Sequence, residues 1–262
     1  MTFLAYHMLK TGVMRHTRIL ALAGLSTALL GTANAEIETS ASIGYHSDYV
    51  YRGLNYGDDL IDFNVGVSGS HDLADWNIGV GFGSWDSFDE FRAEASVSRG
   101  LWEDPFPLVV TVGLANTSYS AGTIKVPGFV KGSPRYYIID HPDRLEPFVG
   151  VSSSLGNLEL SAKAFYNAKN EWANEAYFEA GASYSVELGE NLSGSLSADM
   201  GIWDTDPVHG DLKAGWHYSA TGALQYAASD NITLGVYITY LVNDYWGLED
   251  KAFGGASVSL SF

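Results

Sequence analysis

The side chains with the clearest capacity for chemistry are charged residues and histidines that recur at even spacing within extended segments. In a β-strand, residues two apart lie on the same face, so such groups share one surface. The set comprises His46, Asp48, Arg52, Asp62, Arg92, Glu94, Glu159, Lys163, Glu179, Asp199 and His217. A surface of this kind can select solutes by charge and size. It can equally be a braced polar wall whose charges are matched, because an unpaired buried charge is costly. Both readings stay open.

Catalytic and metal-binding motifs are missing from the sequence. It contains no G-x-S-x-G and no H-E-x-x-H, and its histidines do not have metal-ligand spacing. Some outer-membrane barrels of twelve strands are lipid hydrolases that use a Ser/His pair on the outer wall. In this sequence, His46 and His217 fall on the polar, inward face of their segments instead. We therefore expect no enzyme, no metal and no cofactor.

The elements that position these groups show a two-residue period. Ile232, Leu234, Val236, Ile238, Tyr240 and Val242 alternate with more polar residues between Asn231 and Asn243. This alternation is typical of a strand with one apolar face. Similar segments lie at 40–52, 60–70, 75–84, 90–99, 107–118, 145–154, 157–168, 175–188, 191–203, 213–227, 231–243 and 252–262. Most are long enough for a tilted strand to cross a bilayer. We expect an all-β protein, a closed antiparallel transmembrane barrel of twelve strands, with ten or fourteen as alternatives.

The connections alternate in length, as in outer-membrane barrels with short periplasmic turns and longer outer loops. Short turns lie at 154–157, 188–191 and 229–231, and longer loops at 53–59, 119–144, 168–174, 204–212 and 244–251. The 119–144 loop either folds into the lumen or caps the outside. An even strand number returns both termini to one side.

The first strand is expected to point Tyr45 and Tyr49 outward and Asp48 and Arg52 inward. Asp48 and Arg52 would then form an ion pair, joined by Arg92, Glu94 or Asp62. Many aromatic side chains near strand ends suit the two membrane interfaces, among them Tyr49, Tyr51, Trp76, Trp85, Phe91, Tyr166, Trp203, Trp216, Tyr226, Tyr245 and Trp246.

Residues 1–35 are expected to be a signal peptide. Lys10, Arg15 and Arg18 precede a short apolar run, and the A-x-A pattern at 33–35 predicts cleavage between Ala35 and Glu36. Met14 is an alternative start, and an N-terminal membrane anchor is the alternative reading. The barrel domain would be 36–262.

Composition narrows the function further. Subtracting the 3 basic residues of the signal from the 14 Lys and Arg leaves 11 against 31 Asp and Glu, so the net charge becomes −20. Nucleic-acid phosphates need a basic face, so no nucleic acid is expected as a partner. There is no cysteine, and disulfides cannot support the fold. An exported protein of this kind is either a soluble periplasmic domain or a barrel.

The C-terminal segment alternates Ala256, Val258, Leu260 and Phe262 with serines, and Phe262 is the last residue. It resembles the C-terminal assembly signal of outer-membrane barrels. That resemblance implies the barrel-assembly machinery as a partner during biogenesis, outer-membrane lipid as surroundings, and the bacterial outer membrane as location.

Near the first strand the chain reads Gly44-Tyr45-His46-Ser47-Asp48-Tyr49-Val50-Tyr51-Arg52-Gly53. The S-D-Y-x-x-R-G core resembles the opening of the TorF-type (Gcw_chp) family of outer-membrane proteins that are inferred to be porins. The likeness covers about residues 40–100 and implies a porin without naming a substrate. We expect passive diffusion of small hydrophilic solutes, with a mild preference for cations or neutral solutes. The alternatives are a non-conducting structural or adhesive barrel, and a soluble binding sandwich.

Overall fold

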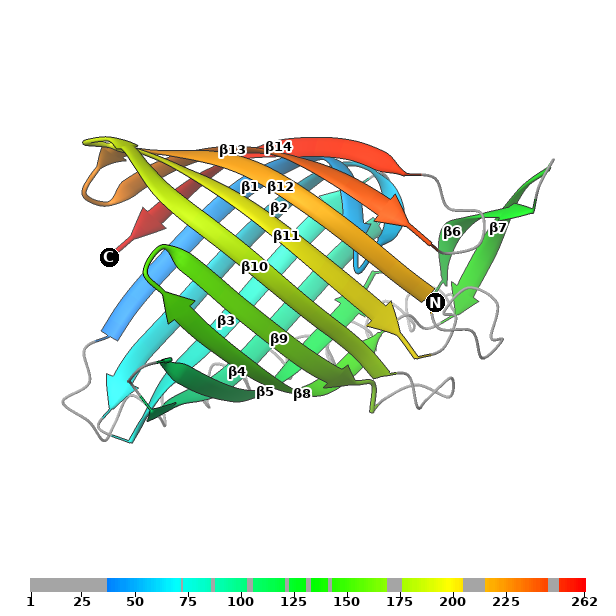
Figure 1. Cartoon of the computed structure of the whole chain (residues 1–262). Coiled ribbons are helices and arrows are strands. Elements are labelled where there is room, and N and C mark those ends of the chain that lie inside the picture. The colour runs from blue at the N-terminus through cyan, green and yellow to red at the C-terminus, as the bar shows by residue number, and fades with distance from the viewer. Residues whose placement is uncertain are drawn as a thin grey trace, which may run out of the picture. The chain divides into compact units, whose positions relative to one another are not determined.

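The computed structural model describes residues 37–71, 73–85, 88–102, 106–120, 123–130, 133–140, 143–168, 176–204, 215–244 and 250–262. The expected signal peptide lies outside this part. Within it, the chain forms fourteen strands (Figure 1), twelve of which close into an antiparallel barrel. The barrel strands are β1 (Ile37–Tyr51), β2 (Leu54–His71), β3 (Ala74–Trp85), β4 (Phe88–Trp102), β5 (Leu108–Tyr119), β8 (Arg144–Leu155), β9 (Leu158–Tyr166), β10 (Ala176–Gly189), β11 (Leu192–Trp203), β12 (Gly215–Ser229), β13 (Ile232–Asn243) and β14 (Lys251–Ser261). The prediction of a twelve-stranded closed barrel is confirmed.

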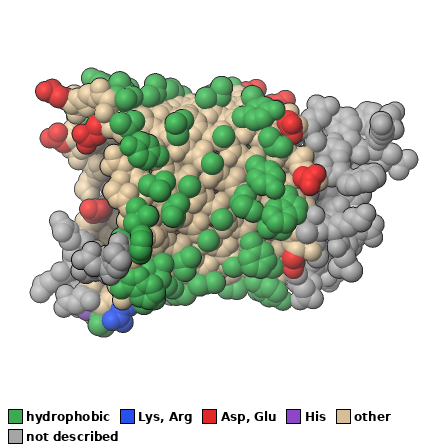
Figure 2. Space-filling view, viewed as in Figure 1, with side chains coloured by type: hydrophobic (Ala, Val, Ile, Leu, Met, Phe, Trp, Pro, Cys, Tyr) green, Lys and Arg blue, Asp and Glu red, His purple; other side chains and the backbone are tan. Residues whose placement is uncertain are grey.

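The apolar face of each strand points outward. Leu196 and Ile238 are 70% and 65% exposed, a degree of exposure that large aliphatic side chains avoid in water. Figure 2 shows hydrophobic side chains spread over the barrel wall, while acidic side chains gather near its two ends. In hydrocarbon, backbone groups must pair within the protein, and a closed sheet provides this without free edges. The barrel is therefore built to stand in a bilayer.

No helix in the described ranges is long and apolar enough to cross a membrane.

The barrel closes between its first and last strands. β1 pairs with β14 from Ser40 opposite Ser261 to His46 opposite Gly255. The Phe262 N–H donates to the Thr39 carbonyl at 2.9 Å, and the Thr39 N–H donates back at 3.2 Å. Phe262 itself is 72% exposed. The last residue thus anchors the seam through its backbone and leaves its ring outside.

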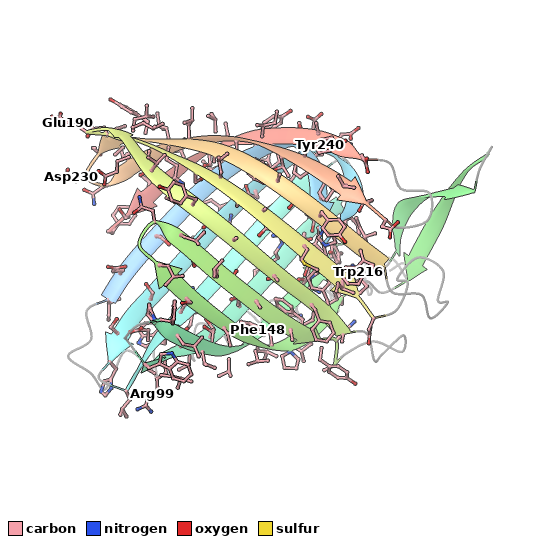
Figure 3. All side chains as sticks on the ribbon, viewed as in Figure 1. Arg99, Phe148, Glu190, Trp216, Asp230 and Tyr240 are labelled. Carbon is pink, nitrogen blue, oxygen red and sulfur yellow. The ribbon has the colours of Figure 1, made fainter. Side chains whose placement is uncertain are left out.

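The two ends of the barrel differ. At one end, called here the short-turn end, hairpins such as β10–β11 and β12–β13 close with two-residue turns. Figure 3 labels Glu190 and Asp230 in these turns, and Trp216 near the opposite, long-loop end. The expected 119–144 loop contains a separate two-stranded sheet, β6 (Thr123–Val130) with β7 (Ser133–Asp140). The sequence did not reveal this hairpin, because its strands have no clear two-residue alternation.

The expected loop at 53–59 is wrong. β1 and β2 form one continuous hairpin that turns at Arg52 and Gly53, with φ angles of 51° and 79°. Positive φ at both central residues is the geometry of a type I′ turn, which favours Asn or Gly. A register shift between Tyr49 and Val50, and a positive φ at Asp59, interrupt the ladder below this turn. Such irregularities bend a strand pair.

Candidate functional site

The tip of the β1–β2 hairpin lies inside the barrel at the long-loop end. Arg52 contacts residues of β8 to β11, which lie across the barrel from β1 and β2, and Gly53 lies next to His217 of β12. In the ring of 12 strands, β9 is half-way around from β1, and β10 is half-way around from β2. With neighbouring strands about 4.8 Å apart and tilted by about 40°, the opposite walls of such a barrel are about 24 Å apart. The hairpin must therefore leave the wall and cross the lumen.

Arg52 makes the central contact of this crossing. Its Nη1 donates to Glu146 Oε1 at 2.6 Å, and its side chain is 6% exposed. Its guanidinium carbon lies 4.4 Å from the ring centres of both Phe165 and Tyr177, and 5.4 Å from that of Trp203. A guanidinium over aromatic faces is attracted by their quadrupoles, most strongly where water is excluded. Arg52 is thus held by one carboxylate and several rings of the far wall.

The far wall is packed around this contact. Tyr177 lies with its ring centre 4.7 Å from that of Trp203 and 6.0 Å from that of Phe165. Tyr177 Oη is 2.9 Å from His217 Nε2. Trp203 Nε1 donates to the Arg52 carbonyl at 3.3 Å, so this ring touches both the backbone and the side chain of the hairpin tip. The sequence predicts Trp203 to lie in an interfacial belt of aromatic residues. This prediction is wrong, because Trp203 is 1% exposed and faces the hairpin tip.

The hairpin is also held near its root. Lys251 of β14 forms ion pairs with Asp48 and, at 3.4 Å, with Asp58. The expected Asp48–Arg52 pair is therefore wrong. The residues lie on opposite sides of the bend, and each finds a closer partner on another strand.

Tyr49 is enclosed and does not point outward as expected, because the hairpin folds into the lumen here and both of its faces are covered, so the neighbours Asp48 and Tyr49 are both buried. It is 2% exposed, and its hydroxyl donates to Glu90, which also pairs with Arg92. Its ring centre lies 5.3 Å from that of Tyr56 across the hairpin. Tyr45, by contrast, faces outward as expected and donates to Asp59 at 2.6 Å.

A second polar cluster lies further along β1 and β2. His46 Nε2 is 3.0 Å from Asp62 Oδ1, and His46 Nδ1 is 2.5 Å from Tyr237 Oη. Asn64 donates to the other Asp62 oxygen at 2.6 Å. This network joins β1, β2 and β13 through inward side chains.

A cavity of about 430 Å³ adjoins the hairpin tip. Its lining includes Arg52, Arg92, Glu94, Glu179, Asp199 and His217, all of which belong to the predicted polar surface. Glu179 Oε1 lies 4.0 Å from Lys163 Nζ, with both side chains partly exposed. Glu159 lies apart from this group, at the short-turn end of β9. The structure thus gathers most of the predicted charges around one space.

Sequence reasoning missed several members of the site, namely Glu90, Arg144, Glu146, Phe165, Tyr177 and Lys251. Parity would have found Glu90, because it alternates with Arg92 and Glu94 on β4. It would equally have placed Glu146 beside Phe148 on the inner face of β8. No local signal shows that these groups meet a turn from the other side of the barrel. Among the described residues, no cluster of His, Asp or Glu has the arrangement of a metal site.

Comparison with solved structures shows the fold. The chain is similar to the NanC porin, with a TM-score of 0.51, 12% identity, and coverage of 86% of this chain and 98% of that one. It is also similar to an outer-membrane channel from Pseudomonas putida, with a TM-score of 0.52, 11% identity, and coverage of 88% and 97%. No family model matches the chain. No curated protein matches it either.

Proposed function

We propose that the protein is a porin of the bacterial outer membrane that lets small hydrophilic solutes diffuse through its lumen. The closed barrel, with its apolar outer wall and a charge-lined inner cavity of about 430 Å³, supports this function. Barrels of about eight strands are filled by side chains, and those of 16 to 18 leave an open channel. Twelve strands leave room for a narrow path that a folded-in hairpin can restrict.

The charges of this path favour cations or neutral solutes. Around the cavity, the carboxylates of Glu94, Glu179 and Asp199 face the lumen. Glu146 pairs with both Arg52 and Arg144, Glu90 pairs with Arg92, and Glu179 pairs with Lys163. Five carboxylates thus face four cationic side chains, which leaves a small excess of negative charge. Fixed charges at a constriction select permeants by sign. The inward residues of the predicted set are thus proposed as the selectivity surface, with Arg52 at its narrowest point.

A non-conducting structural or adhesive barrel is the second candidate. The observation that favours it is the β1–β2 hairpin itself, whose tip contacts the far wall and occupies the lumen at the long-loop end. If the hairpin never moves and leaves no side path, solutes do not pass.

We infer three further features of the chain from its sequence. Residues 1–35 serve as the export signal, with cleavage between Ala35 and Glu36. Phe262 serves as the assembly signal for the barrel-assembly machinery. The Ser47–Gly53 segment supports kinship with the TorF-type family. The protein has no enzymatic role and no nucleic-acid partner in this proposal.

Conductance of the purified barrel in planar bilayers tests the proposal. Discrete conductance steps that scale with salt concentration, and swelling of liposomes in small neutral sugars, are expected. A correctly folded barrel, recognised by heat-modifiable gel migration, that gives neither signal would support the non-conducting alternative.

A further inference from the structure

The contact between Arg52 and the far wall has the composition of a ligand in its site. One carboxylate, Glu146, pairs with the guanidinium, and the rings of Phe165, Tyr177 and Trp203 surround it. These four residues, called here the wall cage, belong to four consecutive strands, β8 to β11. The cation comes from the other side of the barrel.

The wall cage is organised by contacts that do not involve Arg52. The Phe165 ring packs on Phe148 at 5.3 Å between centres, and the Tyr177 and Trp203 rings pack on each other. The Arg144 guanidinium lies 4.8 Å from the Trp203 ring centre and 3.6 Å from Glu146 Oε1. It therefore helps to hold the Trp203 ring and the Glu146 carboxylate in position. Because its members hold one another in place, the wall cage needs little reorganisation when its occupant is exchanged, and the free-energy cost of that exchange is small.

The occupant, by contrast, is placed at a conformational cost. Arg52 has a φ of 51°, in the left-handed region that non-glycine residues rarely adopt. Asn or Gly would suit this turn position better. The arginine is therefore explained by its side chain, and the turn presents that side chain to the wall cage.

The wall cage borders the lumen through two of its rings, Phe165 and Tyr177. The cavity beside the hairpin is lined by Arg52, Phe165 and Tyr177 together with Glu179 and Asp199. A cation in this cavity is drawn by the two further carboxylates towards the rings that hold Arg52. An organic cation would meet the wall cage along the path of a permeating solute.

We propose that the wall cage is a binding site for the guanidinium or primary ammonium group of a solute, and that Arg52 occupies it as an internal ligand. When a solute cation takes the place of Arg52, the β1–β2 hairpin loses its ion pair with the far wall and the long-loop end opens. The opening step rests on the proposed porin function, whereas the binding step does not. Planar guanidinium groups are preferred, because they stack on rings and pair with a carboxylate at once.

Calorimetric titration of the detergent-purified barrel with methylguanidinium chloride tests the binding step, with sodium chloride at equal ionic strength as the reference. Arg52→Ala leaves the wall cage empty and is expected to bind methylguanidinium at least tenfold more tightly than the wild type. The double variant Arg52→Ala/Glu146→Gln is expected to lose this affinity at least tenfold. Equal affinities in the two variants, or no binding to either, would overturn the site.

Arg52→Lys provides a variant that keeps a cation in the wall cage and guards against misfolding of the alanine variant. Because ammonium stacks less well than guanidinium, methylguanidinium is expected to bind Arg52→Lys with an affinity between those of wild type and Arg52→Ala. An affinity equal to that of the wild type would contradict the competition. Arg99→Ala, at an exposed position of β4, should leave wild-type binding unchanged.

Conductance recorded in the same solutions separates this inference from the porin function. Wild-type conductance is expected to rise at least twofold when methylguanidinium replaces part of the sodium, and Arg52→Ala should lose this response. Binding with no conductance in any variant would leave the wall cage standing and remove the opening step with the porin function. Conductance without binding would keep the porin and overturn the wall cage.

Discussion

Arg52 and Glu146 form an ion pair of 2.6 Å across the barrel, although 94 positions separate them in the chain. The pair joins the turn between β1 and β2 to the inner face of β8. It explains why a two-residue turn leaves the rim and enters the lumen. One buried ion pair thus anchors the hairpin tip inside the barrel.

Replacing Glu146 by Gln should destabilise the long-loop end. The change removes the carboxylate that faces both Arg52 and Arg144, so two guanidinium groups lose their anion. Breaking a buried pair by neutralising one partner typically costs about 3–5 kcal/mol. The temperature at which heat-modifiable migration is lost should fall measurably. Glu190→Gln, in an exposed turn, is the matched control, and an equal midpoint for both variants would contradict the role of the pair.

Gly53→Ala should displace the hairpin tip. Gly53 has a φ of 79°, where an L side chain costs about 1–2 kcal/mol. A Cβ at this position would also lie 2.6 Å from His217 Cγ. The expected result is a larger conductance than that of the wild type, measured in planar bilayers. Gly100→Ala meets nothing within 4 Å and should behave as wild type. An unchanged conductance in Gly53→Ala would show that the tip does not restrict the lumen.

The alternation of apolar and polar residues predicted the twelve barrel strands, because each strand separates lipid from a polar interior and its two faces must differ. It placed His46 and Asp62 on one face, and these two form a hydrogen bond. It failed at Tyr49, because the hairpin folds into the lumen there and both faces of β1 are covered. A hairpin that folds into the lumen leaves no mark in a two-residue pattern.

The partners of the hairpin could not be predicted for a different reason. Arg52 meets residues of β8 to β11, and these contacts depend on barrel diameter and on how far the hairpin bends. Neither quantity is written in local spacing. The aromatic residue Trp203 looked like an interfacial ring because it ends a strand, yet it turns inward to cover Arg52.

Arginine on the lipid face should hinder assembly, whereas arginine one residue along the same strand should not. Leu196 is 70% exposed and faces outward, and Ser197 faces the lumen. A lipid-facing arginine costs about 2–4 kcal/mol near the bilayer centre. Leu196→Arg should therefore reduce the folded fraction in lipid vesicles well below that of Ser197→Arg, as read by heat-modifiable migration. Similar yields for the two variants would argue against a membrane-spanning wall.

Removing the lumenal carboxylates should reduce the preference for cations. The triple variant Glu94→Gln/Glu179→Gln/Asp199→Asn neutralises three groups that line the cavity. Reversal potentials in a salt gradient should move towards zero or to the anion-selective side. Asp230→Asn, in a short turn, should keep the wild-type value. A wild-type barrel that already prefers anions would contradict the proposed selectivity.

In the proposed porin, the hairpin that carries Arg52 forms the narrowest part of a polar path through the barrel. The most direct measurement is single-channel conductance of wild type and Arg52→Ala in planar bilayers, with Arg99→Ala as the matched arginine control. Conductance steps of Arg52→Ala are expected to be at least twofold larger than those of wild type and Arg99→Ala. Equal steps in all three proteins, or correctly folded barrels that never conduct, would contradict it.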